Sequence, residues 1–256
     1  IEDVLWQERA NFLFGCSYRQ ESRERDIFSF FCQQDVDGLL VGSVVNPDYL
    51  VAQLQSITIP VAALSQRFEE SQVDYVVNDN YSGAILVMEH LLKLGHTRIA
   101  HISGLDSQTS AQERLRGYQD ALTKAGIAAD KRLLRTSDNT TESGYYLAKD
   151  LLQSVEDLTA MFAYNDLVAL GAFRAIREAN LQVPAAFSLV GYDDITIAEF
   201  FEVPLTTVHQ PMQEIGRKAT EVLLEKIRNG RDHEVQRIVL KPRLTIRSST
   251  SICPDR

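Results

Sequence analysis

The chain has 256 residues, of which 45% are apolar, and its 35 Asp and Glu against 26 Lys and Arg give a formal net charge of −9. This length and composition suffice to bury one or two ordinary hydrophobic cores, so a disordered chain is not expected. Negative charge that is spread evenly repels a phosphate backbone, which argues against DNA binding by this segment.

The cysteines and histidines give no sign of a disulfide framework or a metal site. Cys16, Cys32 and Cys253 form an odd, widely spaced set, which fits a reducing cytoplasm. The five histidines lack metal-ligand spacings, and only His209, on a short connecting segment, is a candidate for lining a pocket. The longest apolar runs have the length of a strand and are interrupted by charges, so no membrane span is expected.

Short apolar runs alternate with amphipathic stretches along most of the chain, which is typical of βα units and a mainly parallel sheet. The first expected element is a helix over residues 1–9. The expected strands are residues 12–16, 38–41, 61–64, 73–77, 99–103, 160–163 and 189–191. Helical spacing of apolar residues predicts helices around 84–92, 115–125 and 215–227, ended by Gly95, Gly126 and Gly230. A capping box of Ser110 and Glu113 is expected to begin the second of these helices.

The end of the chain departs from this alternation. Residues 204–210 are expected to be short and extended, and one long helix and two extended runs, 235–240 and 244–247, follow them. A closed barrel of eight repeats would continue the strand-helix alternation. The ending therefore favours two lobes joined by crossovers.

Polar residues follow several of the expected strands, namely Ser65, the pair Asn165 and Asp166, and the pair Asp193 and Asp194. Ligands of open parallel sheets bind beyond the carboxyl ends of the strands. We expect Asn165 and Asp193 to face a ligand, whereas Asp166 and Asp194 are expected to cap the helices that follow.

Arg114 lies near the start of an expected helix, where a cation opposes the helix dipole and needs another partner. On the residues alone, a surface ion pair with Glu113 or Asp120 explains it as well as a ligand contact does. The preceding polar run, residues 106–110, lines a pocket or forms a solvated loop. No dinucleotide, phosphate-loop or nucleophile-elbow motif is present, which lowers an enzyme interpretation and indicates no cofactor.

Five phrases of the sequence, taken together and in order, resemble the LacI/GalR family of transcription regulators. They are NDNYSGAILVMEHLLKLGHTRIAHISG from Asn78, ERLRGYQDALTKAGI from Glu113, MFAYNDLVALGAFRAIREANLQVPAAFSLVGYDDI from Met161, PLTTVHQPMQEIGRKATEVLLEKI from Pro204 and LKPRLTIRSST from Leu240. Each phrase alone is weak evidence, but five at family-like spacing argue against accidental similarity.

The resemblance implies an α/β fold of the type I periplasmic-binding-protein kind, in which two Rossmann-like lobes with parallel sheets are joined by three crossovers. The expected N-terminal lobe is residues 1–96 plus 211–238, and the expected C-terminal lobe is 97–210 plus 239–256. Family members carry a helix-turn-helix before this core and a first strand that residues 1–256 do not match. The resemblance therefore implies that operator DNA is contacted only through a segment outside this sequence.

The resemblance also implies a binding site for a small polar effector, most simply a sugar, in the cleft of a homodimeric cytoplasmic regulator. Its effector contacts fall on Arg114, Asn165, Asp193 and Gln210. Further positions that often line the cleft are Ser65, Ser82, Ser107 and Ser110. Asn139 stands where sugar- and purine-binding relatives often have a stacking aromatic ring, so the ligand class stays open.

Two other functions remain as alternatives to a regulator whose effector controls operator binding. A periplasmic sugar-binding protein of a transport system has the same fold, but the phrases VHQPMQEIGRKA and RLTIRSST and the three cysteines favour the regulator. An α/β enzyme would need residues for turnover, which the sequence does not obviously supply.

Overall fold

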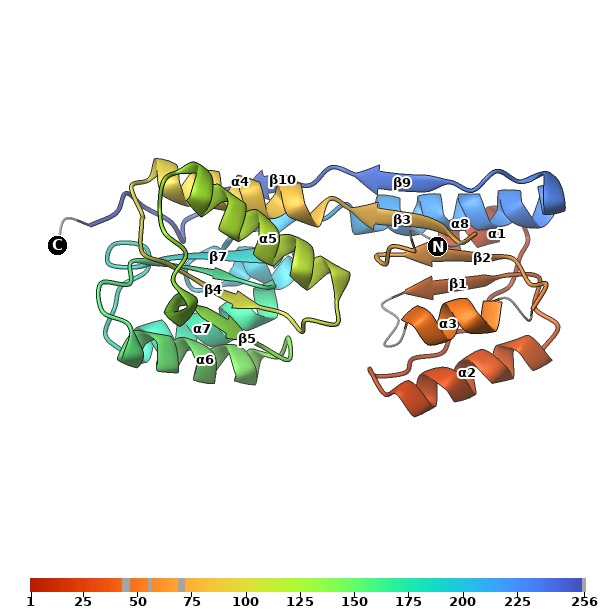
Figure 1. Ribbon diagram of the computed structural model, residues 1–256, viewed down its shortest axis with the longest axis horizontal. Coiled ribbons are helices and arrows are strands. Elements are labelled where there is room, and N and C mark those ends of the chain that lie inside the picture. Colours follow the sequence, from red (N-terminus) through yellow and green to blue (C-terminus); the bar gives the residue numbers. More distant parts are fainter. Residues whose placement is uncertain (43–46, 55–56, 69–71, 255–256) are drawn as a thin grey trace. The chain divides into compact units, whose positions relative to one another are not determined.

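The computed structural model describes residues 1–42, 47–54, 57–68 and 72–254. The chain divides into two compact units, the first made of residues 1–78 and 211–240, the second of 79–210 and 241–256. Each unit is an α/β layer structure in which helices cover both faces of a sheet (Figure 1). This is the periplasmic-binding-protein-like fold class that the family resemblance implies.

The first unit contains a four-stranded sheet in the order β1-β2-β3-β9, with every neighbouring pair parallel. Its elements are α1 (Glu2–Gln7), α2 (Glu21–Gln33), β1 (Leu39–Gly42), α3 (Pro47–Leu54), β2 (Val61–Leu64), β3 (Asp74–Asn78), α8 (Met212–Asn229), η3 (Gly230–Asp232) and β9 (Arg237–Leu240). One face of β3 packs on α8 through Val76 and Ile215, and the opposite face packs on α2 and α3. The last strand of this sheet thus comes from a segment far along the chain.

The second unit contains a six-stranded sheet in the order β10-β8-β7-β6-β4-β5, parallel except for β10. Its elements are α4 (Asn80–Lys93), β4 (Ile99–Ser103), α5 (Thr109–Lys124), η1 (Lys131–Leu133), β5 (Leu134–Thr136), α6 (Thr141–Ser154), β6 (Ala160–Ala163), α7 (Asp166–Glu178), β7 (Ser188–Asp193), η2 (Thr196–Phe200), β8 (Thr206–His209) and β10 (Arg243–Thr245).

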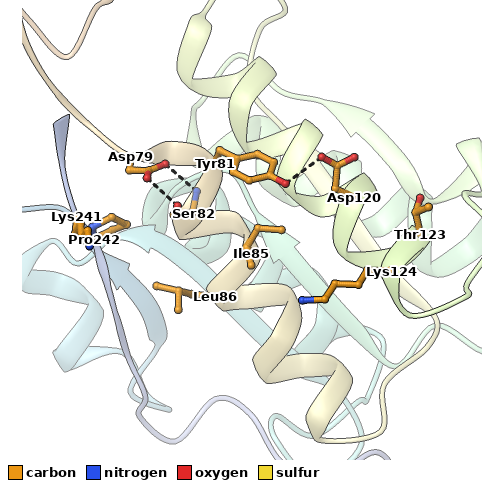
Figure 2. Close-up of a pocket in the computed structure, with 10 residues that line it drawn as sticks. All are labelled: Asp79, Tyr81, Ser82, Ile85, Leu86, Asp120, Thr123, Lys124, Lys241 and Pro242. Carbon is orange, nitrogen blue, oxygen red and sulfur yellow. Dashed lines mark hydrogen bonds between the residues drawn. The ribbon is translucent and has the colours of Figure 1, made fainter. Parts of the chain in front are cut away.

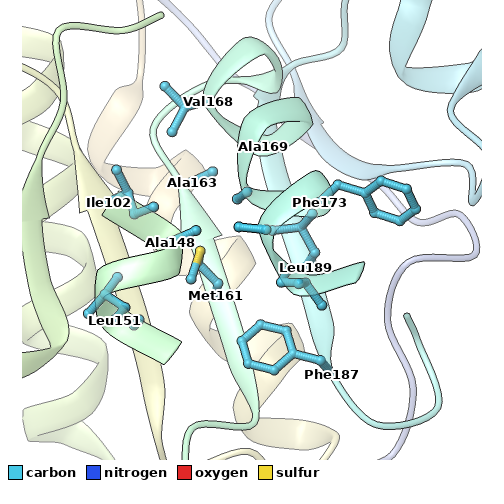
Figure 3. Packing of buried hydrophobic residues seen from close by; sticks show 14 of the residues in the cluster. Ile102, Ala148, Leu151, Met161, Ala163, Val168, Ala169, Phe173, Phe187 and Leu189 are labelled. Atoms are coloured by element: carbon cyan, nitrogen blue, oxygen red, sulfur yellow. The ribbon is translucent and has the colours of Figure 1, made fainter. Parts of the chain in front are cut away.

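Two apolar clusters hold the helices of the second unit to its sheet. On one face, α6 and α7 pack over Ile102, Met161 and Leu189 (Figure 3). On the other face, α4 and α5 pack over Ile99, Phe162 and other strand residues. Because the strands are covered on both faces, their sequences are almost continuously apolar rather than alternating. This rigid layer fixes the strand ends that carry the candidate site.

The predicted helix ends are confirmed where glycine has the left-handed conformation, at Gly95 and Gly126 with φ of +88° and +73°. The predicted capping box is wrong, because α5 begins at Thr109 with Gln108 as its N-cap and no side-chain capping bond. The predicted lobe boundary at residue 96 also differs from the observed division at 78. Helix α4 packs on α5, so it belongs to the second unit.

The strand predicted over residues 12–16 is wrong. These residues form no regular element, and Phe12, Leu13 and Phe14 have exposed side chains. An apolar run forms a strand only where another strand accepts its backbone hydrogen bonds, and among the described strands none pairs with it. The prediction also lacked β5, which is a three-residue strand at the edge of its sheet.

Candidate functional site

The candidate site lies within the second unit, at the carboxyl edge of its parallel sheet. Strands β4, β6, β7 and β8 all end at this edge, followed in turn by residues 104–108, by Tyr164 and Asn165, by Asp194, and by Gln210. Ligands of open α/β sheets bind at such an edge because the loops after the strands gather polar groups there. Three of the predicted effector contacts, Arg114, Asp193 and Gln210, come together here.

Arg114, on α5, is the central cation of this cluster and only 3% of its surface is exposed. Its Nε and Nη2 donate to Asn80 Oδ1 at 3.1 and 2.9 Å, and Nη1 donates to the Tyr164 carbonyl at 2.5 Å. The guanidinium also stacks over the Tyr192 ring, with its Cζ 3.4 Å from the ring centroid. Buried groups thus set the orientation of Arg114, and the alternative of a surface ion pair with Glu113 or Asp120 is wrong.

Asp193 ends β7 in a left-handed conformation, with φ of +109°, that turns its carboxylate toward Arg114 and Gln210. Gln210 Nε2 donates to Asp193 Oδ1 at 2.5 Å, whereas Arg114 Nη2 lies 3.7 Å from the same oxygen. The second distance permits charge attraction but exceeds that of a hydrogen bond. Burial raises the pKa of Asp193, and Arg114 and Gln210 oppose that rise.

A wall of amide and hydroxyl groups adjoins these charges. Asn139, in a left-handed turn after β5, donates from Nδ2 to Gln108 Oε1 at 2.9 Å. The hydroxyls of Ser110 and Tyr164 lie 2.8 Å apart. Neutral groups that both donate and accept hydrogen bonds, beside one buried cation and one carboxylate, suit a polyhydroxylated ligand.

Comparison with known proteins places the chain in a family. Residues 88–250 match the family described as a periplasmic binding protein-like domain. The HTH-type transcriptional repressor PurR of Vibrio atlanticus is 33% identical over 228 residues, which is 89% of this chain and 68% of that protein. The chain belongs to the LacI family of transcriptional regulators.

Solved structures of LacI-family regulators agree with this assignment. A CelR–cellobiose complex is 33% identical, with a TM-score of 0.88 over 96% of this chain and 76% of that one. A LacI-family regulator from Enterococcus faecium with bound ribose is 28% identical, with a TM-score of 0.86 over 99% and 92% of the two chains. The named relatives are transcriptional regulators, a non-enzymatic family, so neither the transport nor the enzyme alternative is favoured.

The residues that cap helices in the structure are not the ones that the sequence predicts. Asn165, rather than Asp166, is the N-cap of α7, and its side chain accepts the Val168 amide at 2.8 Å. Asp166 is fully buried and bonds elsewhere. Asp194 does not cap η2 either, because its carboxylate binds Arg247 and His209 at 2.7 and 2.9 Å.

The remaining four predicted lining residues lie in different places. Ser110 lies in the amide and hydroxyl wall, whereas Ser107 is exposed in the preceding turn. Ser65 follows β2 in the first unit, with φ of +60° and a buried hydroxyl that has no hydrogen-bond partner among the described residues. Ser82 bonds to Asp79 at the start of α4, in a separate open hollow of ≈ 850 Å³ between α4, α5 and residues 241–242 (Figure 2).

Sequence reasoning missed Asn80, Tyr164 and Tyr192, which orient Arg114. Tyr192 directly precedes Asp193 and Tyr164 directly precedes Asn165, so their position at strand ends was a usable signal. Asn80 carried no such signal, because its contact with Arg114 depends on how α4 packs against α5. Among the described residues, no group of three potential ligands could hold a metal ion, and no helix is long and apolar enough to cross a membrane.

Proposed function

We propose that this chain is the effector-binding and dimerising core of a cytoplasmic LacI-type regulator whose affinity for operator DNA depends on a sugar-like effector. The observation that carries the proposal is the 3.7 Å separation between Arg114 Nη2 and Asp193 Oδ1. A ligand hydroxyl beside both groups can accept from the guanidinium and donate to the carboxylate. The cellobiose and ribose bound by related regulators support a sugar-like class.

Control of operator binding requires that the effector bind one conformation of the regulator more tightly than another. Because the chain spans about two thirds of its repressor relative, we assign DNA contact to a segment outside this sequence. Residues 1–256, with net charge −9, are expected to bind operator no better than random DNA. A salt-sensitive, sequence-selective gel shift by this chain would contradict that assignment.

The effector is sought by thermal-shift screening of sugars, sugar phosphates and nucleosides, with cellobiose and ribose included. A ligand at a hundred times its dissociation constant adds about 2.7 kcal/mol to the free energy of unfolding. Hits are then titrated calorimetrically against Arg114→Ala and Asp193→Ala. Each variant should weaken binding by about 1.5–3 kcal/mol, the usual value of a charged hydrogen bond.

The control for this titration is Asp150→Ala, which removes a half-exposed carboxylate on α6 that pairs with Arg135 of β5. Its affinity should equal that of the wild type, because a surface pair contributes little and lies outside the cluster. Unchanged affinity in both Arg114→Ala and Asp193→Ala would show that the effector binds elsewhere.

Homodimerisation is the second part of the proposal, and the face formed by α7 and η2 supports it. Phe200 and Ile197 are 74% and 45% exposed there, beside a hollow of ≈ 550 Å³ lined by Leu170 and Phe173. Arg177 and Glu202 form an ion pair at its rim. Projecting apolar side chains, a receiving hollow and paired charges on one face are self-complementary under a twofold axis.

This part is tested by light scattering of the wild type and of Phe200→Glu at micromolar concentration. The wild type should be a dimer, and the variant should shift toward monomer because a charge would replace a ring that the proposed dimer interface buries. Asp157→Ala, an exposed change outside this face, should leave the mass unchanged. Wild-type monomer, or a Phe200→Glu dimer of undiminished affinity, would contradict the proposed interface.

A further inference from the structure

Asp166 is a fully buried carboxylate that lies beside the effector site without forming part of it. It is the first residue of α7, next to the capping residue Asn165. Its Oδ1 accepts the Thr207 hydroxyl at 2.6 Å, and its Oδ2 accepts the Ile195 amide at 2.9 Å. One side chain thus ties the start of α7 to β8 and to the loop after β7.

These two bonds hold the chain on both sides of Asp193. Thr207 is the register partner of Gly191, two residues before Asp193, and Ile195 comes two residues after it. At Gly191 a Cβ atom would lie 2.2 Å from Asp166 Oδ1, so the carboxylate fills the space that glycine leaves. Asp193 itself has a left-handed conformation that most residues disfavour. Asp166 is therefore placed to maintain that conformation.

The charges around Asp166 are mostly negative. Asp193 and Asp194 both act on it electrostatically, but Asp194 is neutralised by Arg247 at 2.7 Å and is hydrogen-bonded to His209 at 2.9 Å. Asp193 is paired less closely, with Arg114 at 3.7 Å. Burial, with a contribution from both aspartates, raises the pKa of Asp166 to about 7 despite its two hydrogen bonds. The charge of Asp193 thus favours the protonated form of Asp166.

We propose that Asp166 is a positioning residue for Asp193, and that gain or loss of a proton at Asp166 changes the charge and orientation that Asp193 offers to an effector. The effect on an effector rests on the proposed function, whereas the link between Asp166 and Asp193 does not. When Asp166 takes up a proton from solvent, its O–H donates to Thr207 Oγ1, which reverses the donor and acceptor of that bond. When the proton leaves, Asp166 and Asp193 are both negatively charged. The charge on Asp166 then opposes further desolvation of Asp193 by a bound ligand.

The proposal is tested without any ligand, by carbon-13 NMR of the chain labelled at aspartate Cγ, from pH 5 to 9. Signals of Asp166 and Asp193 are assigned from Asp166→Asn and Asp193→Asn. In the wild type, the Asp193 Cγ signal and the Gln210 side-chain amide should share an inflection with the Asp166 signal near pH 7. Asp166→Asn should abolish that inflection, and the surface variant Asp150→Asn should retain it.

Thr207→Val provides a second variant that keeps the side-chain shape but removes the hydroxyl donated to Asp166. Loss of a bond to the charged form should move the shared inflection to higher pH. A flat Asp193 signal where Asp166 titrates, an inflection that survives in Asp166→Asn, or an unmoved midpoint in Thr207→Val would overturn the proposal. Failure of the effector screen would leave these results unaffected, so the two proposals fail separately.

Discussion

Replacing Asn80 with alanine should destabilise the second unit by removing the partner of Arg114. Asn80 Oδ1 accepts two N–H groups of a guanidinium that is only 3% exposed, so water cannot replace it. A hydrogen bond to a charged group contributes about 1.5–3 kcal/mol, and a buried donor left unsatisfied is at the upper end. We therefore expect a loss of about 2–3 kcal/mol, or on the order of 4–12 °C in melting temperature.

The assay is chemical denaturation followed by far-ultraviolet circular dichroism. Asn80→Asp and Ser107→Ala are measured under the same conditions as controls. Asn80→Asp keeps an acceptor for both N–H groups, so its free energy of unfolding should stay within about 1 kcal/mol of the wild type. Ser107 is exposed in a turn, and its truncation should be neutral. If Asn80→Ala unfolds at the same denaturant concentration as Ser107→Ala, the bonds from Arg114 to Asn80 do not stabilise the second unit.

Three further predictions concern buried groups. His101 is stacked on Phe162, and burial lowers its pKa to about 4. Its contribution to the free energy of unfolding is therefore fully present above pH 6.5, and up to about 3 kcal/mol is lost as pH falls toward 4. Nitrogen-15 NMR should show a neutral ring at pH 5.5, and a protonated ring at that pH would contradict this prediction. Gly171→Ala should lower the free energy of unfolding by about 3 kcal/mol or more, because the added Cβ would lie 1.9 Å from the Thr141 carbonyl oxygen. A variant with the melting temperature of the wild type would show that α6 and α7 are not so closely packed. Lys226→Met should destabilise the first unit by about 3 kcal/mol in urea denaturation, since it leaves the fully buried Asp74 without its Lys226 partner. Unchanged stability would mean that His233 and the Gln236 amide are enough to stabilise the Asp74 carboxylate.

Most strands, and the sheet edge at which the candidate site lies, could be predicted because they depend on short-range patterns. Val61–Leu64 and Ile99–Ser103 are buried on both faces, and their apolar runs mark their ends without reference to the rest of the chain. Parallel strands then place the residues that follow them at one edge, which brings Asp193 and Gln210 together wherever the helices lie.

Roles decided by tertiary packing could not be predicted in this way. Asn165 and Asp166 are both good capping residues, and only the space at Gly191 and the hydroxyl of Thr207 select Asp166 for burial. The sequence likewise could not show that Asn80 meets Arg114, because that contact joins two helices across a packed layer. The apolar run at residues 12–16 fulfilled the local requirement for a strand but has no neighbouring strand in the described sheets.

The late position of β9 in the sequence has a consequence for synthesis on the ribosome. Strand β3 is complete at Asn78, but α8 and β9, which cover its face and its edge, come only after residue 211. At 5–20 residues per second, translation of residues 79–210 takes on the order of ten seconds. During that interval the nascent first unit exposes the apolar side chain of Val76 and an open strand edge. Chaperone dependence should therefore be concentrated in this window, and moving residues 211–240 ahead of residue 79 by circular permutation should reduce it.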